Sequence, residues 1–440
     1  MDFSWTDEQI ALRRRAAEFA ERELWPGFQH RDEARTFDRS LWQKVVNYGV
    51  FRLPVPREYG GLGRSLDELI LTLEGIYRHD INGVLIRDLN IKGPRMVAGR
   101  AYADRNGRIL YADTIKADGS VVNDNQKVIT KLNGVTFSEG MIDVTNQSKG
   151  YNYNLSAQLR KRFSDALDAT LAYTYMKSQD VQSLTSDRAI SNWRNGAQTA
   201  GLIDGLSSTT SYFQRPNRII AFGTYTLPWK LTDISFFFEG ISGTPVTYTV
   251  TGDLNGDGYN GNDPIYIPKS ATDPNEIKIG SQSASGVFTQ DYLSAYAFEK
   301  FISNNPCLDK QHGHIMARNS CRSPWQKRMD LSIRQSIPQV RAQNVALQLD
   351  IFNFLNFASY ACHRLGGSCA DWGQNSYPTL SSSFPQQAVL SQTARTPGPL
   401  NQSMPVYTFV TNAMTYGANT ISSTSTSNWY QIQLTARWSF

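Results

Sequence analysis

Long apolar runs are absent from this 440-residue sequence. A helix that crosses a bilayer needs about 18 or more predominantly apolar residues in succession, so the sequence predicts no membrane-spanning helix. The excess of positive charge is small, because 44 lysine and arginine residues are opposed by 39 acidic residues. A dedicated nucleic-acid-binding protein carries a clustered basic face, and we do not expect one here. Residues 1–25 lack an apolar core followed by a small-residue cleavage site, so they do not read as a signal peptide.

Aromatic residues, by contrast, make up 12% of the chain, while only 19% of the residues are charged. The mean hydropathy is −0.41. A transmembrane β-barrel tolerates such a hydrophilic average, because its strands alternate lipid-facing apolar residues with polar residues that face the lumen. The composition is therefore compatible with a transmembrane β-barrel, whereas the lack of long apolar runs excludes a membrane-spanning helix.

The first 75 residues follow the period of α-helices. Thr6 and Gln9 fit a capping box ahead of an apolar stripe that reaches Leu24, and Pro26-Gly27 would end this helix. A second helix is expected between Asp38 and Gly49. Residues 66–73 fit either a third capped helix or the start of a strand.

From about residue 76 the apolar residues recur at every second position. Tyr151, Tyr153 and Leu155 open one such run, and Leu167, Ala169 and Leu171 open another after a turn, which predicts an antiparallel hairpin. Further strands are expected at residues 218–227, 233–250, 328–336, 344–353 and 429–440. Long polar loops are expected at residues 178–214, 253–324 and 358–427. We therefore place a boundary at residues 70–78, between a helical segment (1–75) and a mainly β segment (76–440).

Two strings in the helical segment resemble the N-terminal helical domain of acyl-CoA dehydrogenases. They are Phe-Ser-Trp-Thr-Asp-Glu-Gln at residues 3–9 and Pro-x-Glu-Tyr-Gly-Gly-x-Gly at residues 56–63. The resemblance covers residues 1 to about 73. It implies a structural fragment only, because the flavin and the catalytic carboxylate of that family are held by later parts of the fold. No catalytic or cofactor-binding residue is assigned, and the chain is not expected to be an enzyme.

Residues 76–440 resemble the C-terminal barrel region of TonB-dependent receptors, particularly those with a carboxypeptidase-regulatory-like domain. The strings that carry the resemblance lie at residues 80–90, 252–268 and 347–356, the last being Leu-Gln-Leu-Asp-Ile-Phe-Asn-Phe-Leu-Asn. The resemblance implies an antiparallel outer-membrane β-barrel with about half of the family's 22 strands, and outer-membrane lipid as a partner. We recognise no plug and no segment that contacts TonB. The fragment is therefore not expected to transport by itself, and its ligand is unknown.

The final strand carries the expected signal for the barrel-assembly machinery. Tyr430, Trp438 and the terminal Phe440 belong to a set of apolar residues at every second position, and polar residues stand between the members of this set. A strand with one lipid-compatible face and a terminal aromatic residue suits recognition by that machinery. A half-buried strand of a soluble sandwich is the alternative, because alternation alone fits both.

Asp253, Asn255 and Asp257, followed by Gly258, occupy positions 1, 3, 5 and 6 of a calcium-loop pattern. Oxygen ligands at this spacing, with a sharp turn, can surround a calcium ion. The glutamate that should stand at position 12 is missing, because Pro264 is there. A solvated turn without metal is the alternative. No cofactor other than calcium is expected.

The four cysteines all fall in the expected loops, at Cys307, Cys321, Cys362 and Cys369. An even number confined to the β segment predicts disulfides made outside the cytoplasm, most simply Cys307–Cys321 and Cys362–Cys369, although four cysteines allow three connectivities. A zinc site with the nearby histidines is the alternative, but the spacing fits no standard site. Arg318 and Arg322 belong to a basic cluster that we expect to be solvated or to contact an anionic lipid or substrate.

The sequence thus predicts a partial outer-membrane receptor barrel preceded by a helical fragment. An inactive acyl-CoA dehydrogenase-like fragment is the alternative. The abrupt change of period, together with two incomplete families, also predicts a chimera of two genes. Location in the outer membrane is implied by the resemblance of residues 76–440, and the lack of a recognisable signal peptide conflicts with it.

Overall fold

The computed structural model describes most of the chain. The described residues are 7–27, 39–49, 58, 60, 74–94, 96–111, 114–115, 121–122, 128–129, 131–136, 140–164, 166–196, 199–203, 205–340, 343–367, 386–396, 403–410 and 429–439. None of the helices within these ranges is long and apolar enough to cross a membrane. The third helix or strand expected at residues 66–73 lies outside them.

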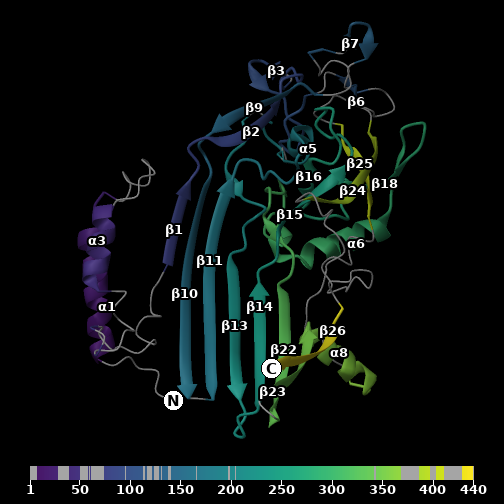
Figure 1. Ribbon diagram of the computed structural model, residues 1–440. Coiled ribbons are helices and arrows are strands. Elements are labelled where there is room, and N and C mark those ends of the chain that lie inside the picture. Colours follow the sequence, from purple (N-terminus) through teal and green to yellow (C-terminus); the bar gives the residue numbers. More distant parts are fainter. Residues whose placement is uncertain are drawn as a thin grey trace.

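The N-terminal segment is helical, as the sequence predicts. Helix α1 (Asp7–Phe19) continues into the π-helix η1 (Ala20–Leu24), and α3 (Arg39–Tyr48) ends at Gly49, whose φ of 90° is easy only for glycine. The two helices touch through the stacked rings of Phe19 and Tyr48, whose centroids lie 4.1 Å apart. Lys44 also forms an ion pair with Glu23, at 2.9 Å. In Figure 1 these helices stand beside the edge of a large sheet.

The large sheet is antiparallel and follows the order β1-β10-β11-β13-β14-β22-β23-β26, with the short β12 (Thr209–Thr210) added to β11. Its strands are β1 (Glu74–His79), β10 (Tyr151–Ser164), β11 (Leu167–Asp180), β13 (Asn217–Thr226), β14 (Thr232–Ile241), β22 (Gln326–Val340), β23 (Gln343–Phe352) and β26 (Gln431–Ser439). The expected hairpin at residues 151–175 is confirmed, with Leu155 opposite Tyr175 and Leu159 opposite Leu171. Among the described residues, β1 and β26 are the two ends of this path, so the sheet is open.

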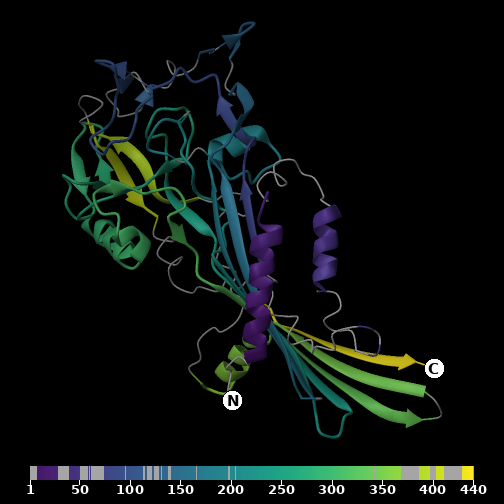
Figure 2. The ribbon, with the colours of Figure 1, turned by 90° about the vertical axis from the view of Figure 1, so that its left-hand side faces the viewer.

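The connections at the two ends of the strands differ greatly in length. At one end, β10–β11, β13–β14 and β22–β23 are joined by only two to five residues. At the other end the chain makes long excursions between β11 and β13, between β14 and β22, and between β23 and β26. Figure 2, a view turned by 90°, shows the strands as a twisted band with most of this extra structure gathered toward one end.

Two of these excursions, the one between β14 and β22 and the one between β23 and β26, build a second, compact unit that we call the lobe (residues 245–324, 386–396 and 403–410). Its mixed sheet has the order β16-β15-β24-β25-β18-β19, with β21 paired to β15. These strands are β15 (Pro245–Thr251), β16 (Asp263–Pro264), β18 (Lys278–Gln282), β19 (Phe288–Gln290), β21 (Cys321–Arg322), β24 (Gln386–Arg395) and β25 (Pro405–Phe409). Strand β24 runs parallel to β15, and β18 runs parallel to β25.

The lobe has its own hydrophobic core, which corrects the expectation of long polar loops at residues 253–324 and 358–427. Helix α6 (Tyr292–Ser303) buries Phe298 and Ile302 in this core, where the ring of Phe298 packs on Phe409 of β25 at a centroid distance of 5.3 Å. The short helix α7 (Pro306–Asp309), the pair β17 (Tyr266–Ile267) and β20 (His314–Ile315), and helix α8 (Phe354–Arg364) also lie in these stretches. Scattered buried residues on short elements leave no periodic signal in the sequence.

The single strand expected at residues 233–250 is divided into β14 and β15. The chain leaves the large sheet at Ser242–Thr244 and passes close to the segment before β22. A Cβ atom at Gly243 would lie 1.7 Å from the carbonyl oxygen of Ser323, so only glycine fits this crossing. The first half of the expected strand therefore joins the large sheet and the second half joins the lobe.

Residues 80–147 lie at the lobe end of the large sheet (Figure 1). Strand β2 (Gly83–Asp88) pairs with β9 (Ile142–Gln147), and three short hairpins lie between them: β3 (Met96–Val97) with β4 (Arg100–Ala101), β5 (Thr114–Ile115) with β6 (Val121–Val122), and β7 (Lys131–Leu132) with β8 (Val135–Thr136). A small core holds this region to helix α5 (Ala189–Gly196) through Ile86, Trp193 and Tyr259.

Candidate functional site: a two-faced sheet and an acidic loop

The large sheet carries two chemically different faces. One row of cross-strand neighbours runs over six strands through Ala169, Gly223, Phe236, Leu331, Ile351 and Ile432. The adjacent row, one residue along each strand, is Asp168, Thr224, Ser235, Ser332, Asp350 and Gln433. Successive side chains of a strand point to opposite sides, so the first row belongs to an apolar face and the second to a polar face.

The apolar face is not covered by the rest of the described structure. Leu155, Leu171, Ile432, Leu434 and Trp438 lie on it and are 52–74% exposed. Both clusters of buried apolar residues lie elsewhere, in the lobe and around Trp193. Contiguous exposed apolar surface on this scale is typical of a face that meets lipid or another protein.

The polar face is held by ion pairs and hydroxyl contacts between neighbouring strands. Arg218 of β13 pairs with Glu239 of β14 at 2.7 Å, and within β22 Arg328 pairs with Asp330 at 2.8 Å. The hydroxyls of Thr224 and Ser235 lie 2.9 Å apart. Phe222 and Phe237, opposite each other, are exceptions to the polar character of this face.

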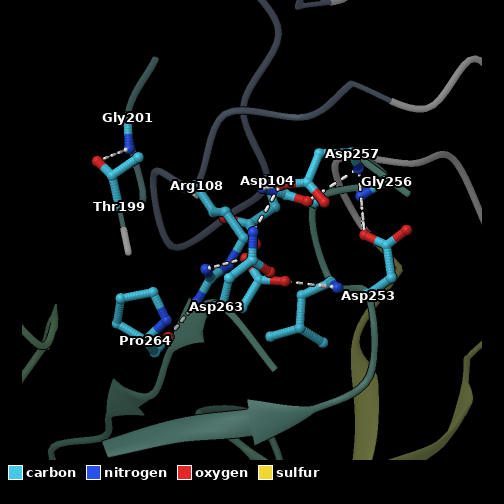
Figure 3. Close-up of polar contacts among 12 residues, drawn as sticks. Asp104, Arg108, Thr199, Gly201, Asp253, Gly256, Asp257, Asp263 and Pro264 are labelled. Atoms are coloured by element: carbon cyan, nitrogen blue, oxygen red, sulfur yellow. Dashed lines mark hydrogen bonds and ion pairs between the residues drawn. The ribbon is translucent and has the colours of Figure 1, made fainter. Parts of the chain in front are cut away.

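A second candidate site is the loop between β15 and β16, which carries the calcium-loop pattern (Figure 3). Asp253 Oδ1 accepts hydrogen bonds from the backbone nitrogens of Gly256 and Asp257, at 2.7 and 3.2 Å, and Oδ2 accepts one from Gly258 at 2.9 Å. Positive φ angles at Gly256 (77°) and Gly258 (88°) allow the loop to wrap around this carboxylate. The structure therefore brings Asp253, Asn255 and Asp257 into one compact turn.

Asp257 is almost completely buried in this loop, at 1% exposed. Its Oδ1 accepts from the backbone nitrogen of Tyr259 at 2.8 Å. Its Oδ2 accepts from Asn255 Nδ2 at 3.2 Å and from Asn262 Nδ2 at 2.9 Å. Burial raises the pKa of Asp257 well above its ordinary value, and the negative charges of Asp253 and Asp263 raise it further.

Asp263, at the end of the loop, forms a buried ion pair with Arg108 from the 80–147 region. Arg108 Nη1 lies 2.7 Å from Asp263 Oδ1, and the two side chains are 2% and 0% exposed. Arg108 Nη2 donates to the carbonyl of Pro264 at 2.5 Å, and Asp263 Oδ2 accepts from the nitrogen of Leu254 at 2.8 Å. Burial raises the pKa of Asp263, although Arg108 opposes this rise.

Sequence reasoning missed the two arginines that border this loop. Arg108 is 155 residues away from Asp263 along the chain, and Arg395 donates to the carbonyl of Leu254, 141 residues away, at 2.6 Å. Both side chains are buried, and burial lowers the pKa of Arg395. No local pattern marks such long-range contacts. Within the described residues, no three histidine, cysteine or acidic side chains are grouped in a way that could hold a metal ion.

Two of the four cysteines form a disulfide within the lobe. Cys307 on α7 is bonded to Cys321 on β21, with their Cα atoms 5.3 Å apart. Cys362, on α8, is also in a disulfide, and Cys369 lies outside the described residues. His312, one of the histidines near these cysteines that the zinc alternative would use, instead places Nδ1 2.5 Å from the carbonyl oxygen of Pro268.

The aromatic residues of the final strand are described up to Ser439. Tyr430 lies just before β26 and contacts the rings of Phe357 and Tyr360, at centroid distances of 5.2 and 5.7 Å. Trp438 lies opposite Val345 and is 65% exposed. Phe440 lies outside the described residues.

Arg318 departs from the expected solvated basic cluster. It is 9% exposed, and its guanidinium lies 2.9 Å from Asp180 at the end of β11 and 2.7 Å from the hydroxyl of Thr209. Arg322 likewise donates to the carbonyl oxygen of Gln214 at 3.1 Å. Arg318 therefore connects the lobe to the large sheet, and Arg322 connects it to the segment between β12 and β13.

Two family models match different parts of the chain. Residues 102–382 match the model described as an outer membrane beta barrel domain, and residues 6–90 match that of the acyl-CoA dehydrogenase N-terminal domain. No solved structure matches the chain significantly.

Curated relatives are similar to a short part of the chain. Benzylmalonyl-CoA dehydrogenase of Aromatoleum aromaticum is 37% identical over 78 residues, which are 18% of this chain and 21% of the relative. The short-chain-specific acyl-CoA dehydrogenase of Clostridium acetobutylicum is 36% identical over 74 residues, 17% of this chain and 20% of the relative. An NADH-dependent acryloyl-CoA reductase of Anaerotignum propionicum is 28% identical over 121 residues, 28% and 30% of the two chains. The chain thus spans between a fifth and a third of the length of these relatives.

Proposed function

Because this chain belongs to the outer membrane β-barrel domain family, whose model matches residues 102–382, we propose that residues 76–440 are part of the barrel of a TonB-dependent receptor. The observation that carries the proposal is the pair of adjacent rows, one apolar and one polar, that cross six strands of the large sheet. Outer-membrane barrels need this alternation, because one face meets lipid and the other lines the lumen.

The arrangement of the connections supports the same proposal. Short turns at one end of the strands and large excursions at the other are typical of outer-membrane barrels, where the long connections lie outside the cell. The lobe would then be an extracellular unit of the receptor, and the final strand with Tyr430 and Trp438 would be recognised by the barrel-assembly machinery. The ligand is not identified by these features.

Transport requires a closed barrel. The free edges of β1 and β26 expose backbone groups that hydrocarbon cannot satisfy, so the sheet described here needs further strands in a membrane. We propose that this chain alone does not transport.

The N-terminal segment gives the alternative, an acyl-CoA dehydrogenase-like fragment. The matches take in only 17–28% of this chain and 20–30% of the relatives, and we propose that the segment carries out no dehydrogenation. A purified chain that binds flavin on reconstitution, seen as visible absorbance, contradicts this.

Two families that match adjoining ranges also support a chimeric gene. Amplification of source DNA across the codons for residues 50–100 tests that idea, because failure to obtain one product means that the join does not exist in the genome.

The barrel proposal is tested by placing a charge on each face of β26. Leu434 lies on the apolar face and Thr435 on the polar face of the same strand. An arginine facing lipid at mid-membrane costs about 2–4 kcal/mol, whereas one facing the lumen is tolerated. Leu434→Arg should therefore abolish assembly into lipid vesicles, and Thr435→Arg should leave it nearly unchanged.

Assembly is measured as the fraction of the full chain that floats with lipid vesicles. Equal effects of the two arginines would refute the two-faced assignment. Failure of the parent chain to float would refute the barrel proposal, because the apolar face would then not meet lipid.

A further inference from the structure

We propose that the loop from Asp253 to Asn262 binds a calcium ion, held by the carboxylates of Asp253 and Asp257 and the side-chain amide oxygens of Asn255 and Asn262. The site lies in the lobe and does not depend on the proposed receptor function.

Asn262 supplies an observation independent of the acidic residues. Its side chain is 2% exposed, and its Nδ2 donates to Asp257 Oδ2 at 2.9 Å. The Oδ1 of the same amide is buried beside this carboxylate and has no hydrogen-bond partner in the described structure. A buried carbonyl oxygen without a hydrogen-bond partner is destabilising, so such a group calls for a ligand. A cation bound between Asn262 and Asp257 would meet both.

Asp257 needs the same ligand for its charge. Its hydrogen bonds come from the backbone of Tyr259 and from the amides of Asn255 and Asn262, all of them neutral donors. Asp263, by contrast, has the guanidinium of Arg108 at 2.7 Å. Buried charges in proteins are generally paired or bound to a metal. The loop therefore contains one carboxylate that is neutralised by an arginine and one that is left for a cation.

The ligand chemistry favours calcium over a transition metal or magnesium. All four groups offer oxygen, and calcium accepts mixed carboxylate and amide oxygens in irregular geometry, whereas magnesium demands a near-ideal octahedron. Asn262 keeps its orientation, because its Oδ1 is the atom without a partner. Asn255 Oδ1 accepts one hydrogen bond, from the backbone nitrogen of Asp257 at 3.0 Å, and its second lone pair can bind the ion.

The missing glutamate predicts modest affinity. Pro264 occupies the position of the usual bidentate ligand, and Asp263 is already engaged by Arg108 and by the nitrogen of Leu254. With two carboxylates and no bidentate group, we expect a dissociation constant of roughly 10⁻⁴–10⁻³ M, the range of extracellular calcium modules.

The test uses the full chain in detergent, freed of metal with a chelator. Calcium binding is measured by titration calorimetry, and terbium is used as a luminescent probe. Tyr259 follows Asp257 closely enough for its ring to transfer energy to a bound lanthanide. We expect saturable calcium binding. We also expect added calcium to displace bound terbium and so to reduce the terbium emission.

Asp257→Asn and Asn262→Ala should each weaken binding on the order of tenfold or more, since even outer-shell changes have effects of this size. Asp309→Asn is the matched control, because this acidic side chain is 56% exposed in the same lobe and far from the loop in sequence. It should leave binding unchanged. Circular dichroism of each metal-free variant shows whether it has folded.

Asn262→Asp keeps the test decisive if Asp257→Asn does not fold. A third carboxylate at the same position should tighten calcium binding and increase the rise in Tm that calcium produces. The proposal is overturned if the parent chain shows no saturable binding at calcium concentrations well above the expected dissociation constant. It is overturned too if Asn262→Asp binds calcium no more tightly than the parent. It is also overturned if folded Asp257→Asn binds as the parent does.

Discussion

Arg108 offers the sharpest test of how the 80–147 region is attached to the lobe. Its guanidinium forms the ion pair with Asp263 at 2.7 Å and donates to the carbonyl of Pro264, and both charged side chains are almost completely buried. Arg108→Met fills a similar volume but leaves the Asp263 charge without its partner. Breaking a buried pair in this way typically costs about 3–5 kcal/mol, because the remaining charge stays desolvated.

The lost stability should be recovered when the negative charge of Asp263 is removed as well. In Arg108→Met/Asp263→Asn, no charge is left behind, and the amide can still accept from the nitrogen of Leu254. Replacing both members of a buried pair is often nearly neutral. A matched control is Arg218→Met, whose ion pair with Glu239 has side chains 48% and 27% exposed, so that its loss should cost less than about 1 kcal/mol.

Hydrogen exchange of the Leu254 amide provides the local assay, because this amide is bonded to Asp263 Oδ2. Its protection, measured by mass spectrometry on peptides from β15 to β16, reports the free energy of opening the loop. The reasoning is refuted if Arg108→Met reduces that free energy by less than about 1 kcal/mol, or if the double variant is as unstable as the single one.

Two further predictions concern the lobe. Since burial raises the pKa of Asp257 above its ordinary value of 3.8, the folded chain holds this proton more tightly than the unfolded chain. The free energy of unfolding without calcium should therefore fall as the pH rises from 3.8 through the raised pKa. Urea unfolding across this window should show a smaller fall in Asp257→Asn, and an identical slope contradicts the assignment. Replacing Cys307 and Cys321 by alanine, which removes a crosslink between residues 14 apart, should lower the stability of the lobe by about 3 kcal/mol. Unchanged hydrogen exchange in α6 after this replacement would contradict the prediction that the disulfide stabilises the lobe.

The sequence was a good guide to the large sheet and a poor guide to the lobe. Strands such as β10 and β11 are long, have one apolar face and are joined by a short turn, so their local pattern already specifies their pairing. The strands of the lobe are short and several are buried on both faces, as in the fully buried run from Pro245 to Val250. Such segments show no alternation, and their partners lie far away in the chain.

The candidate sites divide in the same way. The spacing of Asp253, Asn255 and Asp257 is visible in the sequence because these residues act within one turn. The roles of Asn262 and Arg108 depend on which groups surround them after folding, and a hydrogen bond that spans 155 residues leaves no trace in local spacing. The apolar face was predictable as a pattern, whereas its continuity over six strands required the register.

The position of β24 in the lobe has a consequence for the order of folding. This strand lies between β15 and β25 and supplies Val389 and Leu390 to the core, yet it follows β15 by more than 130 residues. The intervening chain includes the whole β22–β23 hairpin. The core of the lobe therefore cannot be completed until that hairpin and β24 have been synthesised. Long-range parallel pairing of this kind is slow to form. The half-built lobe would expose Phe298, Phe301 and their neighbours during that interval, and a chaperone that shields aromatic surface would be needed most at this stage.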